Sequence, residues 1–235
     1  MIVETCYACS ATATGREHVP PVCLFPEQKD LPPGQDKRKA LITVPSCAAH
    51  NNAKSADDEY LLFVLAANIV ANERGLGQTG TKLVRAVARR HAGLIARAVG
   101  AMEEVDVVDS STGAIHEAAR GFLELRFFES LKLIGLGLYR HHYGKNWTGP
   151  LRAHADFIEV DGLTEGRTEY VETRLSLYSL AGKLFTGATR HGANPDVFWF
   201  SVVETPTQVE CAMRLVFYGG ATVTVFFGLT EAGSE

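Results

Sequence analysis

Four of the five cysteines fall within the first 47 residues of this 235-residue chain, and they stand in two short motifs with the same spacing. Cys6-Tyr-Ala-Cys9 places two thiols on one tight turn, and Cys47-Ala-Ala-His50 places a thiol and an imidazole on another. Three cysteines and one histidine form a ligand set suited to tetrahedral structural zinc. We therefore predict that Cys6, Cys9, Cys47 and His50 bind one Zn²⁺.

The remaining features of the cysteines favour a metal site over disulfide bonds. The cysteine count is odd, and the N-terminal Met-Ile-Val-Glu-Thr-Cys sequence has neither the basic nor the apolar segment of a secretion signal. We therefore expect a cytoplasmic protein in a reducing environment. Cys23 lies in a Pro-Pro-Val-Cys-Leu-Phe context, where we expect a small buried apolar residue and no metal ligand.

Composition is that of a globular protein, with 46% hydrophobic and 21% charged residues. These values exclude a disordered chain and a collagen-like repeat. The longest apolar stretch, residues 60–71, is too short to cross a hydrocarbon layer of about 30 Å, so we expect no membrane partner. The net charge of −4 does not by itself predict a nucleic-acid-binding protein.

Local patterns divide the chain into three segments, residues 1–57, 58–149 and 150–235. The first segment is too small to bury a core of its own and would depend on the metal. Periodic apolar residues predict helices over residues 55–73, 81–102 and 112–139, the first of them ending at Gly75-Leu-Gly77.

The last segment contains runs of β-branched and aromatic residues with partial alternation. These runs predict strands over residues 154–160, 169–176, 197–203, 209–218 and 222–228, with Gly219-Gly220 as a hairpin turn between the last two. We therefore expect an α+β fold, in which a zinc-bound N-terminal module and a helical middle precede a C-terminal antiparallel β-sheet.

The residues between the two cysteine motifs carry a more specific pattern. Glu17-His-Val-Pro-Pro21 follows the first motif, and Leu41-Ile-Thr-Val-Pro-Ser-Cys47 leads into the second, which is followed directly by Asn51. Over residues 4–58 this arrangement resembles the zinc-binding branch of the HNH endonucleases, also called ββα-metal nucleases. The resemblance implies a ββα-metal module that hydrolyses phosphodiester bonds in DNA, in a microbial defence or restriction system.

The same resemblance implies roles for three residues. Glu17 and Asn51 correspond to ligands of the catalytic divalent metal, and His18 corresponds to the general base that deprotonates the attacking water. These residue types suit the roles, because carboxylate and amide oxygens are preferred by Mg²⁺ or Mn²⁺. Imidazole titrates near neutral pH and can accept the proton of a water molecule.

Two positions depart from the family pattern. Ala40 stands where many relatives have an asparagine that orients the general base, so we expect a backbone carbonyl to hold His18. Ser55 stands where some relatives have a third metal ligand, and Asn52 and Asp58 are candidate substitutes. These departures keep open an alternative, in which the chain is a catalytically decayed zinc-bound module that binds nucleic acid or protein.

Charge is unevenly distributed outside the motif. Residues 81–102 contain five basic residues and no acidic residue, and on a helix Lys82, Arg85 and Arg89 would share one face. Such a stripe suits phosphate contacts, although an ordinary solvated helix face has the same composition. We take Lys82, Arg85, Arg89 and Arg90 as candidate DNA contacts.

The C-terminal segment has the opposite character. From residue 150 onward, six basic and eleven acidic residues give a net charge of −5, which disfavours binding to duplex DNA. We therefore expect this segment to support a homodimer or to bind a protein partner.

Overall fold

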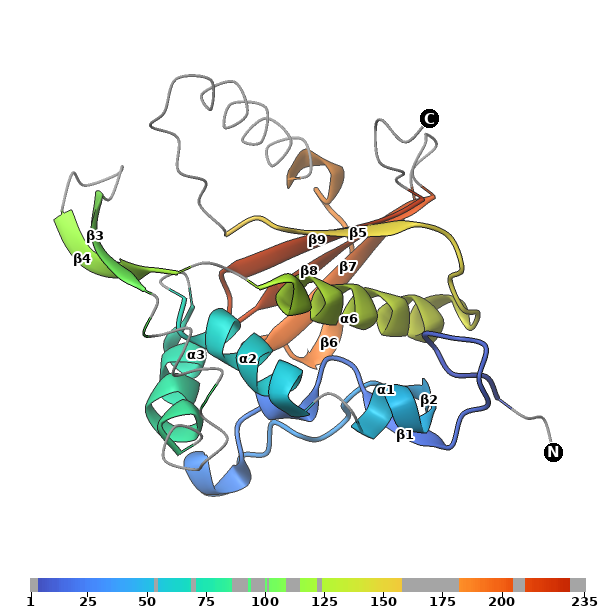
Figure 1. Cartoon of the computed structure of the whole chain (residues 1–235), viewed down its shortest axis with the longest axis horizontal. Coiled ribbons are helices and arrows are strands. Elements are labelled where there is room, and N and C mark those ends of the chain that lie inside the picture. Colours follow the sequence, from blue (N-terminus) through green and yellow to red (C-terminus); the bar gives the residue numbers. More distant parts are fainter. Residues whose placement is uncertain are drawn as a thin grey trace.

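The computed structural model describes residues 4–52, 55–68, 71–85, 93, 100, 102–108, 115–121, 124–157, 182–204 and 210–228. A long helix, α6 (Leu125–Tyr143), lies across one face of a five-stranded sheet, and the N-terminal segment lies on the other side of this helix (Figure 1). Among the described residues, no helix has the length and apolar character needed to cross a membrane.

The N-terminal segment contains two short antiparallel strands followed by a short helix. Strand β1 (Gly15–His18) pairs with β2 (Thr43–Ser46), and α1 (Ala48–Asn52) begins directly after β2. In the register, Gly15 is opposite Ser46 and Glu17 is opposite Val44. Side chains alternate between the two faces of a strand, so these four residues belong to one face.

The C-terminal part confirms the predicted antiparallel sheet. Its strand order is β5-β9-β8-β7-β6, and every neighbouring pair is antiparallel. The strands are β5 (Leu151–Ala155), β6 (His191–Asn194), β7 (Phe198–Glu204), β8 (Cys211–Phe217) and β9 (Ala221–Phe227). The predicted strand over residues 169–176 lies outside the described residues, and β6 was not predicted because its four residues lack β-branched side chains.

The turn between β8 and β9 lies where the sequence predicts it. Tyr218 and Gly219 have positive φ angles of 48° and 77°, which a tight reversal requires. Glycine adopts this conformation without strain, and the buried Tyr218 is held by a 2.6 Å hydrogen bond from its hydroxyl to the Leu24 carbonyl oxygen.

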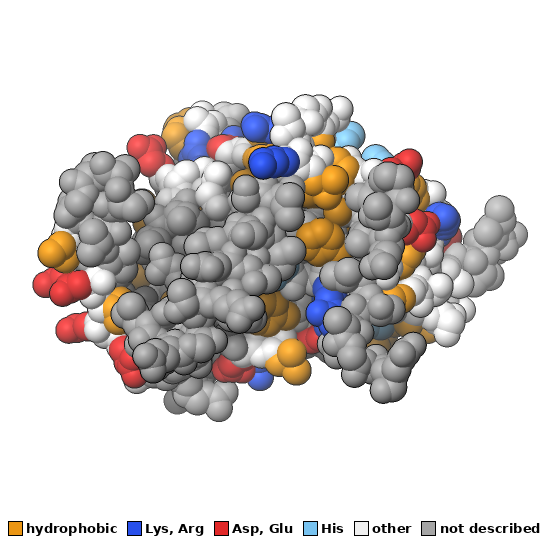
Figure 2. Space-filling model, turned by 90° about the horizontal axis from the view of Figure 1, so that it is seen from above, with side chains coloured by type: hydrophobic (Ala, Val, Ile, Leu, Met, Phe, Trp, Pro, Cys, Tyr) orange, Lys and Arg blue, Asp and Glu red, His pale blue; other side chains and the backbone are white. Residues whose placement is uncertain are grey.

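The prediction of a helix over residues 112–139 is wrong in its first part. The structure has a hairpin of β3 (Glu103–Val108) and β4 (Ile115–Arg120), and α6 begins only at Leu125. Residues 115–120 favour a helix locally, but the alternating valines of β3 provide a partner strand, and cross-strand pairing outweighs that preference. Exposed acidic side chains gather at the end of the molecule that this hairpin occupies (Figure 2).

The first predicted helix is two helices in the structure, α2 (Ser55–Ala66) and α3 (Glu73–Gln78). The Asn72 side chain accepts hydrogen bonds from the backbone N–H groups of Arg74 and Gly75, which starts a new helix where the sequence suggests an end. A π-helical turn, Thr79–Leu83, follows α3. Of the helix predicted over 81–102, residues 84, 85, 93 and 100 are helical, and the others from 86 to 101 lie outside the described residues.

Helix α6 packs closely against both of its neighbours because two glycines remove side chains from it. A Cβ atom on Gly135 would lie 2.9 Å from a methyl group of Val225 in β9, and one on Gly137 would lie 2.6 Å from a methyl group of Val19. One hydrophobic cluster consequently includes residues of the N-terminal segment, α6 and the sheet.

We expect Gly137→Ala to lower the free energy of unfolding. Alanine gains about 1 kcal/mol in helix propensity, but the clash with Val19 costs more, because overpacking a core costs about 1–3 kcal/mol. Gly77→Ala is the matched control, because its Cβ would meet nothing within 4 Å. Urea unfolding should show a loss for Gly137→Ala and a gain for Gly77→Ala; equal shifts would contradict the close packing.

Candidate metal centre and adjoining pocket

The four predicted zinc ligands come together. His50 Nδ1 lies 3.5 Å from Cys6 Sγ, 3.6 Å from Cys9 Sγ and 3.3 Å from Cys47 Sγ. The Sγ atoms of Cys9 and Cys47 lie 3.8 Å apart, and all four ligand atoms are within 4.8 Å of one another. The structure therefore brings together residues that are up to 44 positions apart in the chain.

These separations can be compared with the edges of a zinc tetrahedron. Zn–S bonds of about 2.3 Å and Zn–N bonds of about 2.0–2.1 Å give S–S edges of about 3.8 Å and S–N edges of about 3.5 Å. The four side chains therefore lie close enough to bind a metal ion, and both the distances and the thiolate-imidazole set are consistent with zinc.

Backbone hydrogen bonds shape both halves of the centre. Cys6 N–H donates to the Ala11 carbonyl at 2.8 Å, and Tyr7 N–H donates to the Pro45 carbonyl at 2.9 Å, which holds the first turn against β2. Hydrogen bonds from the backbone and side chain of His50 lower the pKa of Cys47 to about 6. Cys47 is therefore mainly thiolate at neutral pH, the form that binds a metal.

Cys23 is not part of this group. Its Sγ donates to the Asp58 carbonyl oxygen at 3.4 Å, and burial raises its pKa. A neutral thiol in this position packs as a small apolar group.

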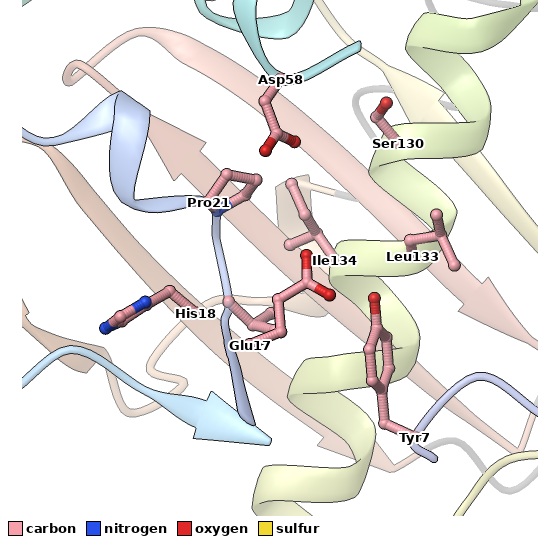
Figure 3. Close-up of a pocket in the computed structure, with 9 residues that line it drawn as sticks. Tyr7, Glu17, His18, Pro21, Asp58, Ser130, Leu133 and Ile134 are labelled. Carbon is pink, nitrogen blue, oxygen red and sulfur yellow. The ribbon is translucent and has the colours of Figure 1, made fainter. Parts of the chain in front are cut away.

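A small pocket adjoins the metal centre and contains Glu17. It is lined by residues from the first turn, β1, the following loop, α2 and α6: Tyr7, Glu17, His18, Val19, Pro21, Asp58, Ser130, Leu133 and Ile134. The Glu17 carboxylate and the Tyr7 hydroxyl point into the same space, with α6 as one wall (Figure 3). No sequence signal indicated α6 as part of this site.

Glu17 is a buried carboxylate with a fixed orientation. Its side chain is 8% exposed, and Oε2 accepts a hydrogen bond from the Ser46 hydroxyl at 3.3 Å. Burial, and then the negative charge of Glu17, raise the pKa of Tyr7, so Tyr7 stays protonated. Ser46 and Tyr7 therefore provide polar neighbours for the acid on the inner face of β1.

Asn51 lies on the same face of β1 as Glu17. Its Nδ2 atom would be 3.5 Å from a Cβ atom placed on Gly15, and Gly15 and Glu17 are two residues apart on one strand. The structure therefore brings the two predicted oxygen ligands to one side of the hairpin. The Asn51 residue itself is exposed at the end of α1.

His18 has the opposite orientation. Its ring points away from the Glu17 carboxylate (Figure 3), and the residue is exposed. The alternation of side chains along β1 explains this divergence, because His18 directly follows Glu17. The predicted acid and base therefore stand on different sides of the same strand end.

Asp58 approaches the pocket from the start of α2, with its carboxylate directed into it (Figure 3). The side chains of Asn52 and Ser55 lie outside the described residues. Within the described part of the chain, the Cys₃His group is the only set of three or more converging Cys, His, Asp or Glu side chains. The binding of Mg²⁺ or Mn²⁺ by Glu17 and Asn51 therefore stays a prediction, based on the oxygen ligands that these ions prefer.

Two of the four basic residues predicted to contact DNA bind the chain itself. Lys82 Nζ donates to the carbonyl oxygens of Cys23 and Phe25 at 2.6 and 3.0 Å, and burial lowers its pKa to about 8. Arg85 donates to both carboxylate oxygens of Asp30, at 2.9 and 2.6 Å. Arg89 and Arg90 lie outside the described residues, so their contact with DNA stays a prediction.

Comparisons with known proteins identify no related protein. No protein-family model, curated protein or solved structure matches the chain.

We expect Cys47→Ser to abolish stoichiometric zinc binding, because it removes one of four ligands of a closed tetrahedral site. Cys23→Ser is the matched control, since Cys23 lies outside the centre. Elemental analysis after a mild chelator wash should find about one zinc per chain in the native protein and in Cys23→Ser, and little in Cys47→Ser. Equal zinc contents in the two variants would contradict the assignment.

We expect Arg85→Gln to reduce stability in a pH-dependent way. The hydrogen bond from Arg85 lowers the pKa of Asp30, so the stabilisation is present above the ordinary carboxyl pKa of about 4 and is lost as the pH falls. Urea unfolding at pH 7 should show a clear loss that shrinks towards pH 3.

The control for this measurement is Lys132→Gln, which removes an ion pair with the half-exposed Glu129. It should have little effect at either pH. An equal effect of Arg85→Gln at both pH values would contradict a structural role for the Arg85–Asp30 pair.

Proposed function

We propose that this protein is a metal-dependent endonuclease of the HNH type that hydrolyses phosphodiester bonds in DNA. The observation that carries the proposal is the position of Asn51. It directly follows a zinc ligand, and it lies on the face of β1 that presents Glu17. Two oxygen-bearing side chains, one of them from the Glu-His-Val-Pro-Pro motif, thus lie on one side of the β1–β2 hairpin beside the Cys₃His group.

Glu17 and Asn51 would hold the catalytic Mg²⁺ or Mn²⁺. A cation bound there would neutralise charge that develops on the scissile phosphate and on the leaving oxygen. The Ser46 hydroxyl, 3.3 Å from the Glu17 carboxylate, keeps that carboxylate in one orientation. Asp58 faces the same pocket and would bind a water ligand of such an ion or the ion itself.

His18 would act as the general base. Its ring is exposed at the end of β1, where a water molecule and a phosphodiester can reach it. A neutral imidazole accepts a proton from the attacking water, and a hydrogen bond from the other ring nitrogen to a backbone carbonyl would orient it. Because the His18 ring points away from the Glu17 carboxylate, the scissile phosphate would have to lie across the end of β1 to reach both residues.

The zinc ion would have a structural role alone. Four protein ligands complete its tetrahedron, so no position remains for water or substrate. An activity of this kind suits restriction or phage defence in a microbial cell, an inference by analogy with other nucleases of this type.

One observation favours a second function, a zinc-bound module that binds nucleic acid or protein without cleaving it. Glu17 is only 8% exposed, and α6 covers the pocket on the side where the carboxylate points. An acid enclosed in this way has limited access to a polymer. Binding without hydrolysis would then be the activity of the exposed surfaces beside the zinc centre.

We expect the native protein to nick supercoiled plasmid DNA in the presence of Mg²⁺ or Mn²⁺, and not in excess chelator. His18→Ala should lower the rate by about 10²–10⁴-fold, the usual contribution of a general base, and Glu17→Gln should lower it at least as much. His141→Ala is the matched control, because His141 is an exposed histidine at the far end of α6. It should cleave at the native rate.

Zinc content should be equal in all three variants, which shows that a lost rate does not reflect a lost fold. Cleavage by His18→Ala at the native rate would contradict the assignment of the base. If none of the proteins cleaves single- or double-stranded DNA with either metal while the native protein still binds DNA, the binding module is the correct function.

A further inference from the structure

The two faces of the C-terminal sheet differ in chemistry. Side chains alternate along each strand, and the face towards α6 is apolar, as Met213 and Leu215 show on β8. On the opposite face, Arg214 of β8 is paired in register with Ser201 of β7 and with Thr224 of β9. Thr224 is in turn paired with His154 of β5, so four adjacent strands contribute a polar row to this face.

This polar row is largely buried. Ser201 is 2% exposed and Thr224 is fully buried, and Arg214 is half-buried between the buried residues Ala212 and Val216. Hydroxyl groups and a cation are unusual in the buried centre of a sheet face, because their removal from water costs free energy unless polar partners replace the water.

The guanidinium group of Arg214 has no such partner among the described residues. Its Nε atom is buried without a hydrogen-bond acceptor, and the side chain forms no ion pair there. Its recorded contact is with the aromatic ring of Phe185, whose centroid lies 4.9 Å from the guanidinium carbon. The ring partly compensates the positive charge but accepts no strong hydrogen bond from the five N–H groups.

The described neighbours of the Arg214 guanidinium do not supply an acceptor for it. A Cβ atom on Gly182 would lie 3.9 Å from Arg214 Nη2, so the backbone of this glycine lies close to the guanidinium. The Asp156 carboxylate contacts the Thr224 hydroxyl at 3.5 Å. Asp156 follows β5, and β9 lies between β5 and β8, so this acid stands on the far side of Thr224 from Arg214.

We propose that Arg214 binds a small oxyanion on this face, the phosphoryl or carboxylate group of a small molecule, with the Ser201 hydroxyl as a second donor. The guanidinium group presents a fixed fork of N–H donors that matches an oxyanion. A small ligand fits better than a nucleic acid, because the row is largely buried and the segment from residue 150 onward has a net charge of −5. This site is independent of the nuclease proposal.

Thermal unfolding of the full chain tests the proposal, with inorganic phosphate and acetate as separate probes at an ionic strength held constant with NaCl. We expect one or both anions to raise the Tm by a few degrees at concentrations well above Kd. Arg214→Met should abolish this response and raise the Tm without anion, because it replaces an unpaired cation with an apolar group.

Arg190→Met is the matched control. Its guanidinium carbon lies 4.3 Å from the centroid of the Trp199 ring, so this variant also removes an arginine–aromatic contact. The anion response should persist in it. If Arg214→Met does not fold, Ser201→Ala provides a second test, and it should weaken the anion affinity about 5-fold through the loss of one hydrogen bond.

Each outcome decides the proposal. A response to phosphate alone identifies a phosphoryl ligand, a response to acetate alone identifies a carboxylate ligand, and both support an oxyanion site. The absence of any anion response in the native protein would overturn the proposal, as would a response that persists in Arg214→Met. If Arg214→Met without anion has a lower Tm than the native protein without anion, Arg214 stabilises the fold through its contact with Phe185, and the proposal is overturned.

Discussion

The convergence of three thiols and one imidazole is the constraint on which the N-terminal segment depends. The segment's two strands have only four residues each and its helix has five, so regular hydrogen bonding contributes little stability. A metal ion bound by all four ligands would link the first turn to the start of α1. The positions of Glu17 and Asn51 follow from that link, because β1 and α1 flank the centre.

Helix α6 is the second organising element, since it packs against both the Glu17 pocket and the C-terminal sheet. One side supplies Ser130, Leu133 and Ile134 to the wall of the Glu17 pocket. The other side covers the apolar face of the sheet, which leaves the opposite face to Arg214 and its neighbouring hydroxyl groups. The same helix thus encloses Glu17 and determines which face of the sheet belongs to the hydrophobic core.

Sequence reasoning succeeded where the information is local. The predicted metal ligands follow from two four-residue motifs, and β7, β8 and β9 follow from alternation and a glycine turn. The strand predicted over residues 154–160 overlaps β5 by two residues only. Sequence reasoning failed for the hairpin before α6, where pairing between residues 103–108 and 115–120 outweighs helix propensity. It could not show that Lys82 and Arg85 bind backbone and Asp30, nor that α6 encloses Glu17, because these contacts join residues more than 50 positions apart.

The glycine at position 137 has a consequence for how this chain can be divided. Val19 inserts into the space that a side chain at that position would occupy, so an apolar part of the N-terminal segment packs directly against α6. A fragment that ended after α1 would retain all four metal ligands yet expose this apolar side to water. The N-terminal segment therefore depends on α6, and transferring it to another protein would require a substitute for the helix that covers it.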